Sequence, residues 1–298
     1  MKTLTEAAQV REALRKQGFA RGAVKPASYH AWKSQLGEPC VSKSTLIDFM
    51  RNPFKFRWEQ EHGGKEETAA MRKGSLIDCL VLTPELFENL YAVEEINRRT
   101  KEGKAREAEL LEQGKTILTP KELAEAQNIE DAAVRALTRF APYGTQEAMW
   151  VRLTHVGSYE LPQPVIVSGM LDVRPGAAEL PLLDLKTTSA DLTSENELNR
   201  AMANFGYGIQ AAMYVDLWQT CTGEAREFAF LFVSTDTPAQ TRIVRVGEGT
   251  LELYRRRYRE AIARFSECAE NGVWGAQELP EIEYRPPMWE INREGGEA

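Results

Sequence analysis

The feature that most constrains this chain is an apolar, strand-like run that contains an acid and a base, Leu182-Leu183-Asp184-Leu185-Lys186-Thr187. Side chains alternate between the two faces of a strand, so Asp184 and Lys186 project from one face and the two leucines between and before them from the other. Such a pair needs a chemical reason in a strand that is otherwise apolar, although, taken alone, it is also typical of a surface ion pair.

A second aspartate precedes this run. Asp172 lies in Gly-Met-Leu-Asp-Val, again among apolar neighbours, and a turn at Pro175-Gly176 separates it from the run with Asp184. A hairpin could place Asp172 opposite Asp184, where two carboxylates would repel each other strongly unless a divalent cation lay between them. The sequence therefore predicts a site for Mg²⁺, with Mn²⁺ as an alternative ion, held by Asp172, Asp184 and the backbone carbonyl of Leu185.

Four further side chains are candidates for the same site. Lys186 could position and help activate an attacking water, or stabilise negative charge that builds on a phosphate. Glu147, in the first predicted strand, is a candidate additional acid near the same end of the sheet. Gln210 and Tyr214 are four residues apart in a helical run and point the same way, either into a cleft or as ordinary packing residues.

The spacing of apolar residues changes along the chain from a helical to a strand-like period. The first half is predicted to be mostly helical, and after Pro142 three consecutive strands are expected at about 147–156, 165–174 and 180–188. A helix is predicted over 207–220, strands over 227–234 and 241–246, and an amphipathic helix that ends near 271. The fold class is therefore α+β (α/β) with a helical N-terminal portion.

One central domain with two appendages is the predicted organisation. Residues 1–28 are interpreted as a short helix, expected over 5–18, followed by a linker that contains Gly22 and Pro26. The folded body is expected over 29–275. Residues 276–298 are rich in charge and proline and are interpreted as a C-terminal arm or tail.

Composition excludes several classes of protein. The chain has 37 Lys and Arg against 44 Asp and Glu, a net charge of −7, which argues against a DNA binder that relies on a global excess of basic residues. A DNA enzyme is not excluded, because its acids can hold metal ions while its bases act locally. Apolar runs are too short for a membrane span, the N-terminal segment lacks a secretion pattern, and the scattered cysteines indicate neither zinc nor disulfides. A cytoplasmic location and no membrane partner are expected.

The order of the motifs resembles the RecB-like branch of the PD-(D/E)XK nuclease superfamily and, more closely, the RecE (exonuclease VIII) family of phage-type exonucleases. An acid is followed by Gly-Met-Leu-Asp at 169–172, Leu-Asp-Leu-Lys-Thr-Thr at 183–188 and Gln-Ala-Ala-Met-Tyr at 210–214. Strings in the first half match as well, among them Tyr29-His30, Ser42-Lys43-Ser44, Gly74-Ser75-Leu76-Ile77 and Asn97-Arg98-Arg99-Thr100. The resemblance extends over about residues 29–275.

This resemblance implies a PD-(D/E)XK core with a central mixed sheet flanked by helices, and a magnesium-dependent 5′-to-3′ exonuclease that degrades linear double-stranded DNA. It also implies a homo-oligomeric ring, phage- or prophage-encoded in a bacterial host. Such a ring acts at double-stranded DNA ends and exposes 3′ single strands for recombination by a RecT-like single-strand annealing protein. Asp172 and Asp184 would be metal ligands, Lys186 the catalytic lysine, and Gln210 and Tyr214 the downstream motif.

One position departs from the family pattern. Asp78 stands where members usually have histidine, and its carboxylate can also ligate Mg²⁺ but cannot reproduce a neutral imidazole. Two alternatives therefore stay open beside the exonuclease. One is a catalytically weakened or inactive module that binds DNA ends, and the other is an endonuclease of the same superfamily.

A local basic path to the acidic site is expected if DNA reaches it. The candidate DNA-binding residues are Arg72, Lys73, Arg98, Arg99, Lys101 and Lys104. The charge-dense segment 97–121 is equally typical of a solvated loop or helix surface. For the basic cluster at 255–259, the solvated face of the last helix is slightly favoured over a contact with DNA.

Overall fold

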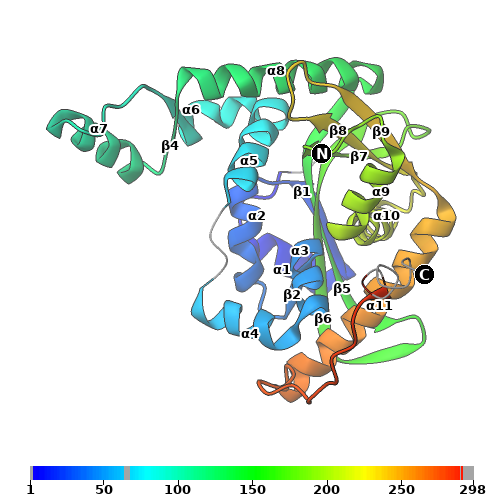
Figure 1. Ribbon diagram of the computed structural model, residues 1–298. Helices are drawn as coiled ribbons and strands as arrows, with labels where there is room; N and C mark the ends of the chain where they lie inside the picture. The colour runs from blue at the N-terminus through cyan, green and yellow to red at the C-terminus, as the bar shows by residue number, and fades with distance from the viewer. Residues whose placement is uncertain (1–2, 64–67, 289, 291–298) are drawn as a thin grey trace, which may run out of the picture.

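The centre of the molecule is a seven-stranded mixed β-sheet (Figure 1). The computed structural model describes residues 3–63, 68–288 and 290 of the 298-residue chain. The strand order is β1-β5-β6-β7-β8-β9, and β2 pairs with β6 beside this path. The strands are β1 (Phe19–Ala23), β2 (Cys40–Ser42), β5 (Tyr143–Val156), β6 (Tyr159–Pro175), β7 (Leu182–Thr188), β8 (Phe228–Ser234) and β9 (Thr241–Val246).

The sheet combines antiparallel and parallel pairs. The β2–β6 and β7–β8 pairs are parallel, whereas β1–β5, β5–β6, β6–β7 and β8–β9 are antiparallel. A separate parallel pair is formed by β3 (Tyr91–Val93) and β4 (Thr116–Leu118). The mixed sheet and its flanking helices confirm the predicted α+β class.

Helices cover both faces of the sheet and account for most of the first half of the chain, as expected. They are α1 (Ala7–Gln17), α2 (Pro26–Trp32), α3 (Lys43–Arg51), α4 (Pro53–His62), α5 (Ala69–Leu82), α6 (Phe87–Leu90), α7 (Lys101–Glu112), α8 (Pro120–Leu137), α9 (Glu195–Asn204), α10 (Tyr207–Thr222) and α11 (Glu248–Asn271). Helix α7 projects from the body of the molecule in Figure 1.

Strand alternation divides the core into three apolar clusters. In β6, Val165 and Val167 belong to the cluster under α10 and α11, whereas Ile166 belongs to the cluster under α1 and α2. Further along the sheet, α5 and α8 pack on Leu183 and Leu185 of β7. The helices α2 and α5 therefore cover different parts of the sheet, and they leave room for a cavity between them.

The linker predicted after the first helix is wrong. Residues 19–23 form β1, which pairs with β5 so that Ala20 lies opposite Trp150, and residues 26–32 form α2. Ala20 and Trp150 are both buried in the α1–α2 cluster. The small and basic residues of Phe-Ala-Arg-Gly-Ala carry little intrinsic strand preference, so tertiary pairing with β5 determines this strand.

The strands of the second half match their predictions. The three consecutive strands correspond to β5, β6 and β7, and the strands predicted over 227–234 and 241–246 correspond to β8 and β9. Helix α1 lies within the range expected for it, and α10 and α11 occupy the two predicted helical runs.

The two charge-rich segments behave differently. Segment 97–121 contains α7, most of whose side chains are exposed, and β4. Segment 276–287 of the predicted arm is exposed and carries neither helix nor strand, while positions 289 and 291–298 of the arm lie outside the described residues. Among the helices that the structure describes, none is long and apolar enough to span a membrane.

Candidate active site

A cavity of about 750 Å³ lies on the sheet between α2 and α5. It is lined by six residues of the predicted site, which come from α5, β6, β7 and α10: Asp78, Asp172, Asp184, Lys186, Gln210 and Tyr214. The start of α3 and the helix α2 close the cavity from the other side. The fold thus brings together residues that are up to 136 positions apart in the chain, from 78 to 214.

The two aspartates meet because β6 and β7 separate where their pairing ends. The strands pair at Val173 and Leu183. Beyond this point the backbone N–H of Leu185 donates to Oδ2 of Asp172, at 2.9 Å, and not to the backbone of β6. The Asp172 carboxylate therefore takes the place of a strand partner and lies beside β7, from which Asp184 projects.

Asp184 is buried against α10 and is bonded from two sides. The Gln210 amide donates to Oδ1 of Asp184, and the Lys186 ammonium forms an ion pair with Oδ2. Asp184 is 2% exposed and Gln210 4%. Within the described structure, Oε1 of Gln210 is a buried acceptor that receives no hydrogen bond. A buried amide oxygen without a donor, beside a carboxylate, fits a cation with oxygen ligands.

Burial and mutual repulsion raise the pKa values of the other two carboxyl groups. For Asp172, burial and then the charges of Asp184 and Asp78 raise the pKa well above its usual value. Burial also raises the pKa of Asp78, to about 6, although the nearby Lys186 ammonium opposes this effect. The cluster therefore resists carrying three negative charges, and a bound cation would relieve this repulsion.

Lys186 keeps its proton in this surrounding. Burial by itself would lower the pKa of Lys186, but the carboxylates of Asp184 and Asp172 outweigh burial and raise it above its usual value. A lysine that stays protonated donates hydrogen bonds and cannot accept a proton from water. Of the roles predicted for Lys186, orienting water and stabilising phosphate charge fit this state, whereas proton abstraction does not.

A second lysine in the cavity was missed by the sequence reasoning. Lys43 is the first residue of α3, and its Nζ lies 4.9 Å from the centre of the Tyr207 ring, which is also 5.5 Å from Nζ of Lys186. Burial, and then repulsion from Lys186, lowers the pKa of Lys43 to about 8. The helix dipole disfavours a cation at a helix N-terminus. The lysine in Ser42-Lys43-Ser44, at the start of a predicted helix, is therefore unusual and could have marked Lys43 as a candidate site residue.

Tyr214 and His30 contribute neutral groups to the wall of the cavity. A side chain at Gly169 would come within 2.7 Å of the Tyr214 ring, so this glycine lets α10 approach β6 closely. Burial raises the pKa of Tyr214 well above its usual value, and burial lowers the pKa of His30. Both side chains are therefore neutral at physiological pH.

Glu147 does not join the acidic cluster, contrary to expectation. It is 1% exposed and forms ion pairs with Arg21 and Arg174, both at 2.9 Å. Its partner across the ladder is Leu171, and residues opposite each other share a face of the sheet. Its side chain therefore lies on the face of Leu171 and not on that of Asp172.

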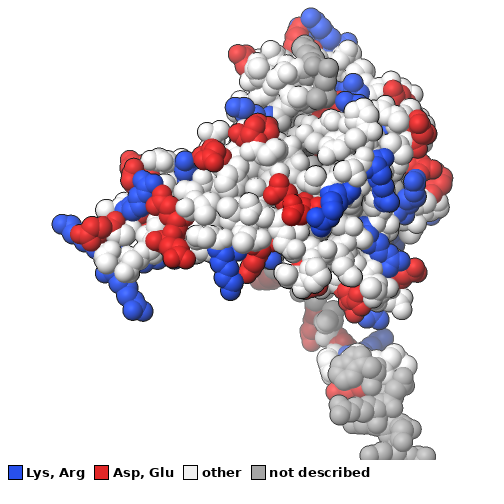
Figure 2. Space-filling view, turned by 90° about the horizontal axis from the view of Figure 1, so that it is seen from above, with Lys and Arg blue, Asp and Glu red and all other residues white. Residues whose placement is uncertain are grey.

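The predicted DNA-binding residues lie outside this cavity. Arg72, Lys73 and Arg98 line a neighbouring hollow of about 390 Å³. Arg98 is paired with Glu107 at 2.7 Å, and Arg99, Lys101 and Lys104 are exposed. Figure 2 shows basic and acidic side chains interspersed over the projecting part of the molecule that carries α7. On this face the predicted basic path is therefore interrupted by acids.

The oxygen atoms in the cavity suit a divalent ion without forming a complete ligand set. Over the described ranges, no three His, Cys, Asp or Glu side chains form a metal-binding group. The donors that the structure offers are the carboxylates of Asp172 and Asp184, with Asp78, the Gln210 amide oxygen and the Leu185 carbonyl as further candidates. These are hard oxygen ligands, which Mg²⁺ and Mn²⁺ prefer.

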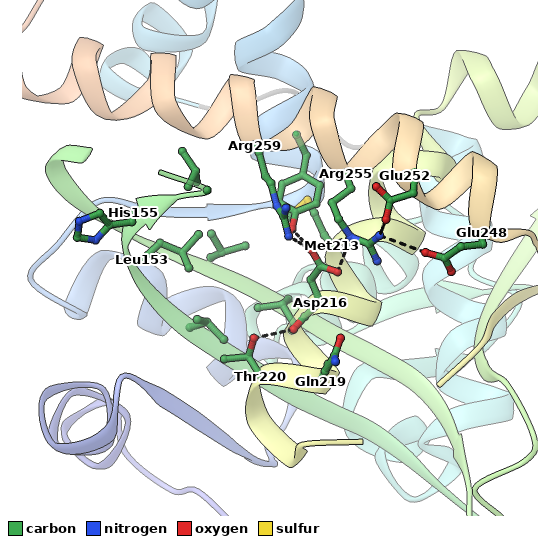
Figure 3. Close-up of a pocket in the computed structure, with 16 residues that line it drawn as sticks. Leu153, His155, Met213, Asp216, Gln219, Thr220, Glu248, Glu252, Arg255 and Arg259 are labelled. Atoms are coloured by element: carbon green, nitrogen blue, oxygen red, sulfur yellow. Dashed lines mark hydrogen bonds and ion pairs between the residues drawn. The ribbon is translucent and has the colours of Figure 1, made fainter. Parts of the chain in front are cut away.

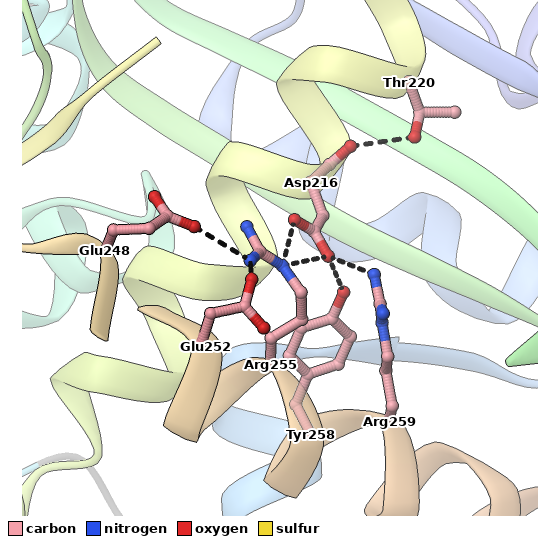
Figure 4. Close-up of polar contacts among 7 residues, drawn as sticks. All are labelled: Asp216, Thr220, Glu248, Glu252, Arg255, Tyr258 and Arg259. Atoms are coloured by element: carbon pink, nitrogen blue, oxygen red, sulfur yellow. Dashed lines mark hydrogen bonds and ion pairs between the residues drawn. The ribbon is translucent and has the colours of Figure 1, made fainter. Parts of the chain in front are cut away.

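A second cavity, of about 710 Å³, lies along another side of α10 (Figure 3). Its wall includes Asp216 of α10 and Arg255, Tyr258 and Arg259 of α11. Both oxygens of the Asp216 carboxylate accept hydrogen bonds from these three side chains (Figure 4). Arg255 and Arg259 are thus engaged within the protein, and the half-buried Arg255 differs in this from the solvated helix face slightly favoured for the 255–259 cluster.

Comparison with known proteins supports a PDDEXK-like fold. A family model described as a PDDEXK-like domain of unknown function (DUF3799) matches residues 174–284, which include Asp184, Lys186, Gln210 and Tyr214 but not Asp172. No curated protein matches the chain. This match and the mixed sheet support a PD-(D/E)XK-like fold, and they do not point to the RecE family specifically.

Two solved structures are similar to this chain. The crystal structure of a candidate exonuclease from Eubacterium rectale has a TM-score of 0.60 at 16% identity and covers 91% of this chain and 98% of its own. A phage-related exonuclease from Haemophilus somnus 129PT has 17% identity over 80% of this chain and 98% of its own, with a TM-score of 0.33. The first of these supports the fold.

Proposed function

We propose that this PD-(D/E)XK-fold protein is a magnesium-dependent exonuclease that degrades linear double-stranded DNA in the 5′-to-3′ direction. The observation that carries the proposal is the buried cluster of Asp172, Asp184 and Lys186, beside which the amide oxygen of Gln210 receives no hydrogen bond from the described residues. Paired acids beside a protonated lysine are the groups that metal-assisted phosphodiester hydrolysis needs.

Each residue of the cluster has a different role in the proposed hydrolysis. The oxygen of a water molecule attacks phosphorus and gives up a proton to the solvent, the bond to the leaving oxygen breaks, and the leaving oxygen takes up a proton from the solvent. Asp172 and Asp184 would hold the metal ion, which when bound lowers the pKa of water and neutralises phosphate charge. The ammonium groups of Lys186 and Lys43 stabilise the negative charge that grows on the phosphate oxygens. Gln210 holds Asp184 in place through its amide hydrogen bond.

The finer features of the proposal concern the substrate and its partners. We propose that the protein acts at double-stranded DNA ends and leaves 3′ single strands for a RecT-like annealing protein. We further propose a homo-oligomeric ring in the cytoplasm of a bacterial host, with a phage or prophage origin. The resemblance of the motifs to RecE-type enzymes supports these features.

Linear and closed circular DNA, compared in one experiment, test the exonuclease. Linear duplexes labelled at either the 5′ or the 3′ end of one strand, and a covalently closed circle, are incubated with the protein and Mg²⁺. The proposal predicts early release of the 5′ label, late release of the 3′ label and an intact circle. Cleavage of the circle would instead indicate an endonuclease of the same superfamily, and early release of the 3′ label would reverse the polarity.

A second candidate function is a DNA-end-binding module with weak or no hydrolysis. It is favoured by Asp78, in place of the histidine usual in RecE-type enzymes, together with the incomplete set of metal ligands across the described residues. This candidate predicts that the protein binds DNA ends without digesting them, even with Mn²⁺. In that case Asp78→His should restore nucleotide release, whereas Asp78→Asn should not.

A further inference from the structure

An exposed aromatic ring stands next to the candidate active site. Phe205, in the short connection between α9 and α10, is 58% exposed. Its ring stacks on Tyr207 with 5.7 Å between ring centres and 23° between the planes. Tyr207 is the ring beside which both cavity lysines lie, with Nζ of Lys43 at 4.9 Å and Nζ of Lys186 at 5.5 Å from its centre. One stacked ring therefore separates Phe205 from the lysine pair.

The ring of Phe205 is supported by a stack of aromatic rings that extends into the core. Tyr207 stacks in turn on Phe230 of β8, with 5.2 Å between ring centres, and Phe230 is fully buried. The three rings form a column that begins in the core of the sheet and ends at the surface. The outer face of Phe205 is therefore presented to solvent on a rigid support.

The backbone beside Phe205 is fixed as well. Its N–H donates to the carbonyl of Ala201 at 3.0 Å, and Gly206 adopts a left-handed conformation with φ +64°. A side chain at Gly206 would come within 2.3 Å of Ile47, so the connection packs closely on α3. Arg51 of α3 donates to the carbonyl of Asn204 at 2.9 Å. The ring thus projects from a braced turn between two helices.

This combination suits an unpaired nucleobase. Proteins that hold single-stranded nucleic acid place aromatic rings, on which bases stack, beside cations that contact the phosphates. Phe205 supplies the ring, Lys43 and Lys186 supply ammonium groups one ring away, and Arg51 has further guanidinium N–H groups beside the turn. Stacking on a ring tolerates any base, which suits an enzyme that reads no sequence.

We propose that Phe205 stacks on an unpaired base of the DNA strand whose phosphate lies at the Lys43–Lys186 pair. This inference rests on the proposed function, because it names the form in which DNA occupies that site. The ring holds the terminal bases apart from the complementary strand while the backbone lies among the lysines and aspartates. Phe205 is thus a substrate-binding residue that favours ends with separated strands.

The fluorescence of 2-aminopurine, a base whose emission falls when it stacks, tests this contact. The full-length protein binds duplexes with one 2-aminopurine at each of the first positions from the 5′ end, with Ca²⁺ in place of Mg²⁺ to limit hydrolysis. Phe205→Leu keeps an apolar side chain without a ring, and Phe205→Trp keeps a ring. Tyr159→Leu is the matched control, because Tyr159 is also exposed (43%) but lies at the far end of β6, thirteen residues along the strand from Asp172.

Wild type and Phe205→Trp should show a fall in emission confined to one or two adjacent positions, and Phe205→Leu should lose it. Phe205→Leu should also bind the DNA about tenfold more weakly, within the range measured for single base–aromatic contacts, and this loss should vanish when that nucleotide is abasic. Tyr159→Leu should behave as wild type. Thermal melting of each variant checks that it is folded.

The outcomes separate this inference from the proposed function. An emission profile that is the same in Phe205→Leu and wild type overturns the stacking contact, even if wild type digests DNA with Mg²⁺. A profile that depends on Phe205, in a protein that releases no nucleotides with Mg²⁺, supports the contact and overturns the exonuclease. A wild type that shows no position-specific change contradicts the contact as well.

Discussion

Two clusters of charged side chains lie on different sides of α10, and they differ in how completely their polar atoms are paired. In the structural cluster, the half-buried Asp216 is bonded by Arg255, Tyr258 and Arg259, with both arginine contacts at 2.9 Å (Figure 4). In the active-site cluster, Asp184 is bonded by Gln210 and Lys186, but the buried amide oxygen of Gln210 has no hydrogen bond across the part of the chain that is described.

The difference separates a structural role from a chemical one. Half-buried charges that are paired on all sides hold neighbouring elements together, and the Asp216 cluster joins α10 to α11 in this way. Buried carboxyl groups with raised pKa values, beside a buried amide oxygen that lacks a hydrogen bond within the described structure, are typical of functional sites. Although the two cavities are of similar volume, we therefore place the chemistry in the one lined by Asp184.

The largest change in stability is expected from breaking the structural cluster. Asp216→Asn removes the charge that faces Arg255 and Arg259, and should lower the free energy of unfolding by about 2–3 kcal/mol, below the range for a fully buried pair, because Asp216 is half-buried and Arg255 keeps Glu252 and Glu248. Urea unfolding measures this. The same substitution at Asp184 should cost less in the metal-free protein, because the lost ion pair with Lys186 is offset by the lost repulsion of Asp172 and Asp78. Equal losses in both variants would erase the distinction between the clusters.

A smaller effect is expected from pH in the metal-free protein. Asp78 keeps its proton up to about pH 6 when folded, whereas its usual pKa is 3.8. Between these values the folded state binds more protons than the unfolded state, so this stabilisation is present near pH 4 and lost as the pH rises through about 6. In EDTA, wild type should lose about 2 kcal/mol more than Asp78→Asn between pH 4.5 and 7. Parallel curves for the two proteins would contradict the raised pKa.

The smallest effect concerns the second lysine. Lys43→Met keeps the stem of the side chain but removes the ammonium group, and should lower the rate of DNA hydrolysis about tenfold, because Lys186 still provides one cation. Single-turnover digestion measures this rate. Lys16→Met, at an exposed lysine of α1, is the matched control and should digest DNA at the wild-type rate. An unchanged rate in Lys43→Met would remove Lys43 from the active-site cluster.

The sequence predicts the second half of the fold well because local and tertiary preferences agree there. The apolar runs of β6, β7 and β8 are bounded by turns, and the buried faces of α10 and α11 follow a helical period. Residues 19–23 are an exception, because their sequence has no strand-like pattern and they form a strand only through pairing with β5. The sequence shows the intrinsic preference of a segment, but it does not show which distant segment will pair with it.

The sequence predicts the part of the active-site cluster that depends on strand alternation. Alternation places Asp184 and Lys186 on one face, and the structure adds Asp172 and Asp78 beside them. The prediction that Glu147 joins the cluster is wrong, because the register of β5 against β6 places its side chain on the opposite face of the sheet. The sequence does not reveal this register. Lys43 was missed for a related reason, since α3 reaches the cavity through contacts that no spacing in the sequence records.

The most direct test of the central claim is digestion of linear duplex DNA by wild type and Lys186→Ala, each with Mg²⁺ and with EDTA. Lys186→Ala removes the protonated amine next to Asp184 and leaves the Asp216 cluster intact. We predict that wild type releases nucleotides with Mg²⁺ alone, and that Lys186→Ala is about a thousandfold slower while thermal melting shows that it is still folded. Nucleotide release that persists unchanged in Lys186→Ala would contradict the assignment of this cluster as the active site.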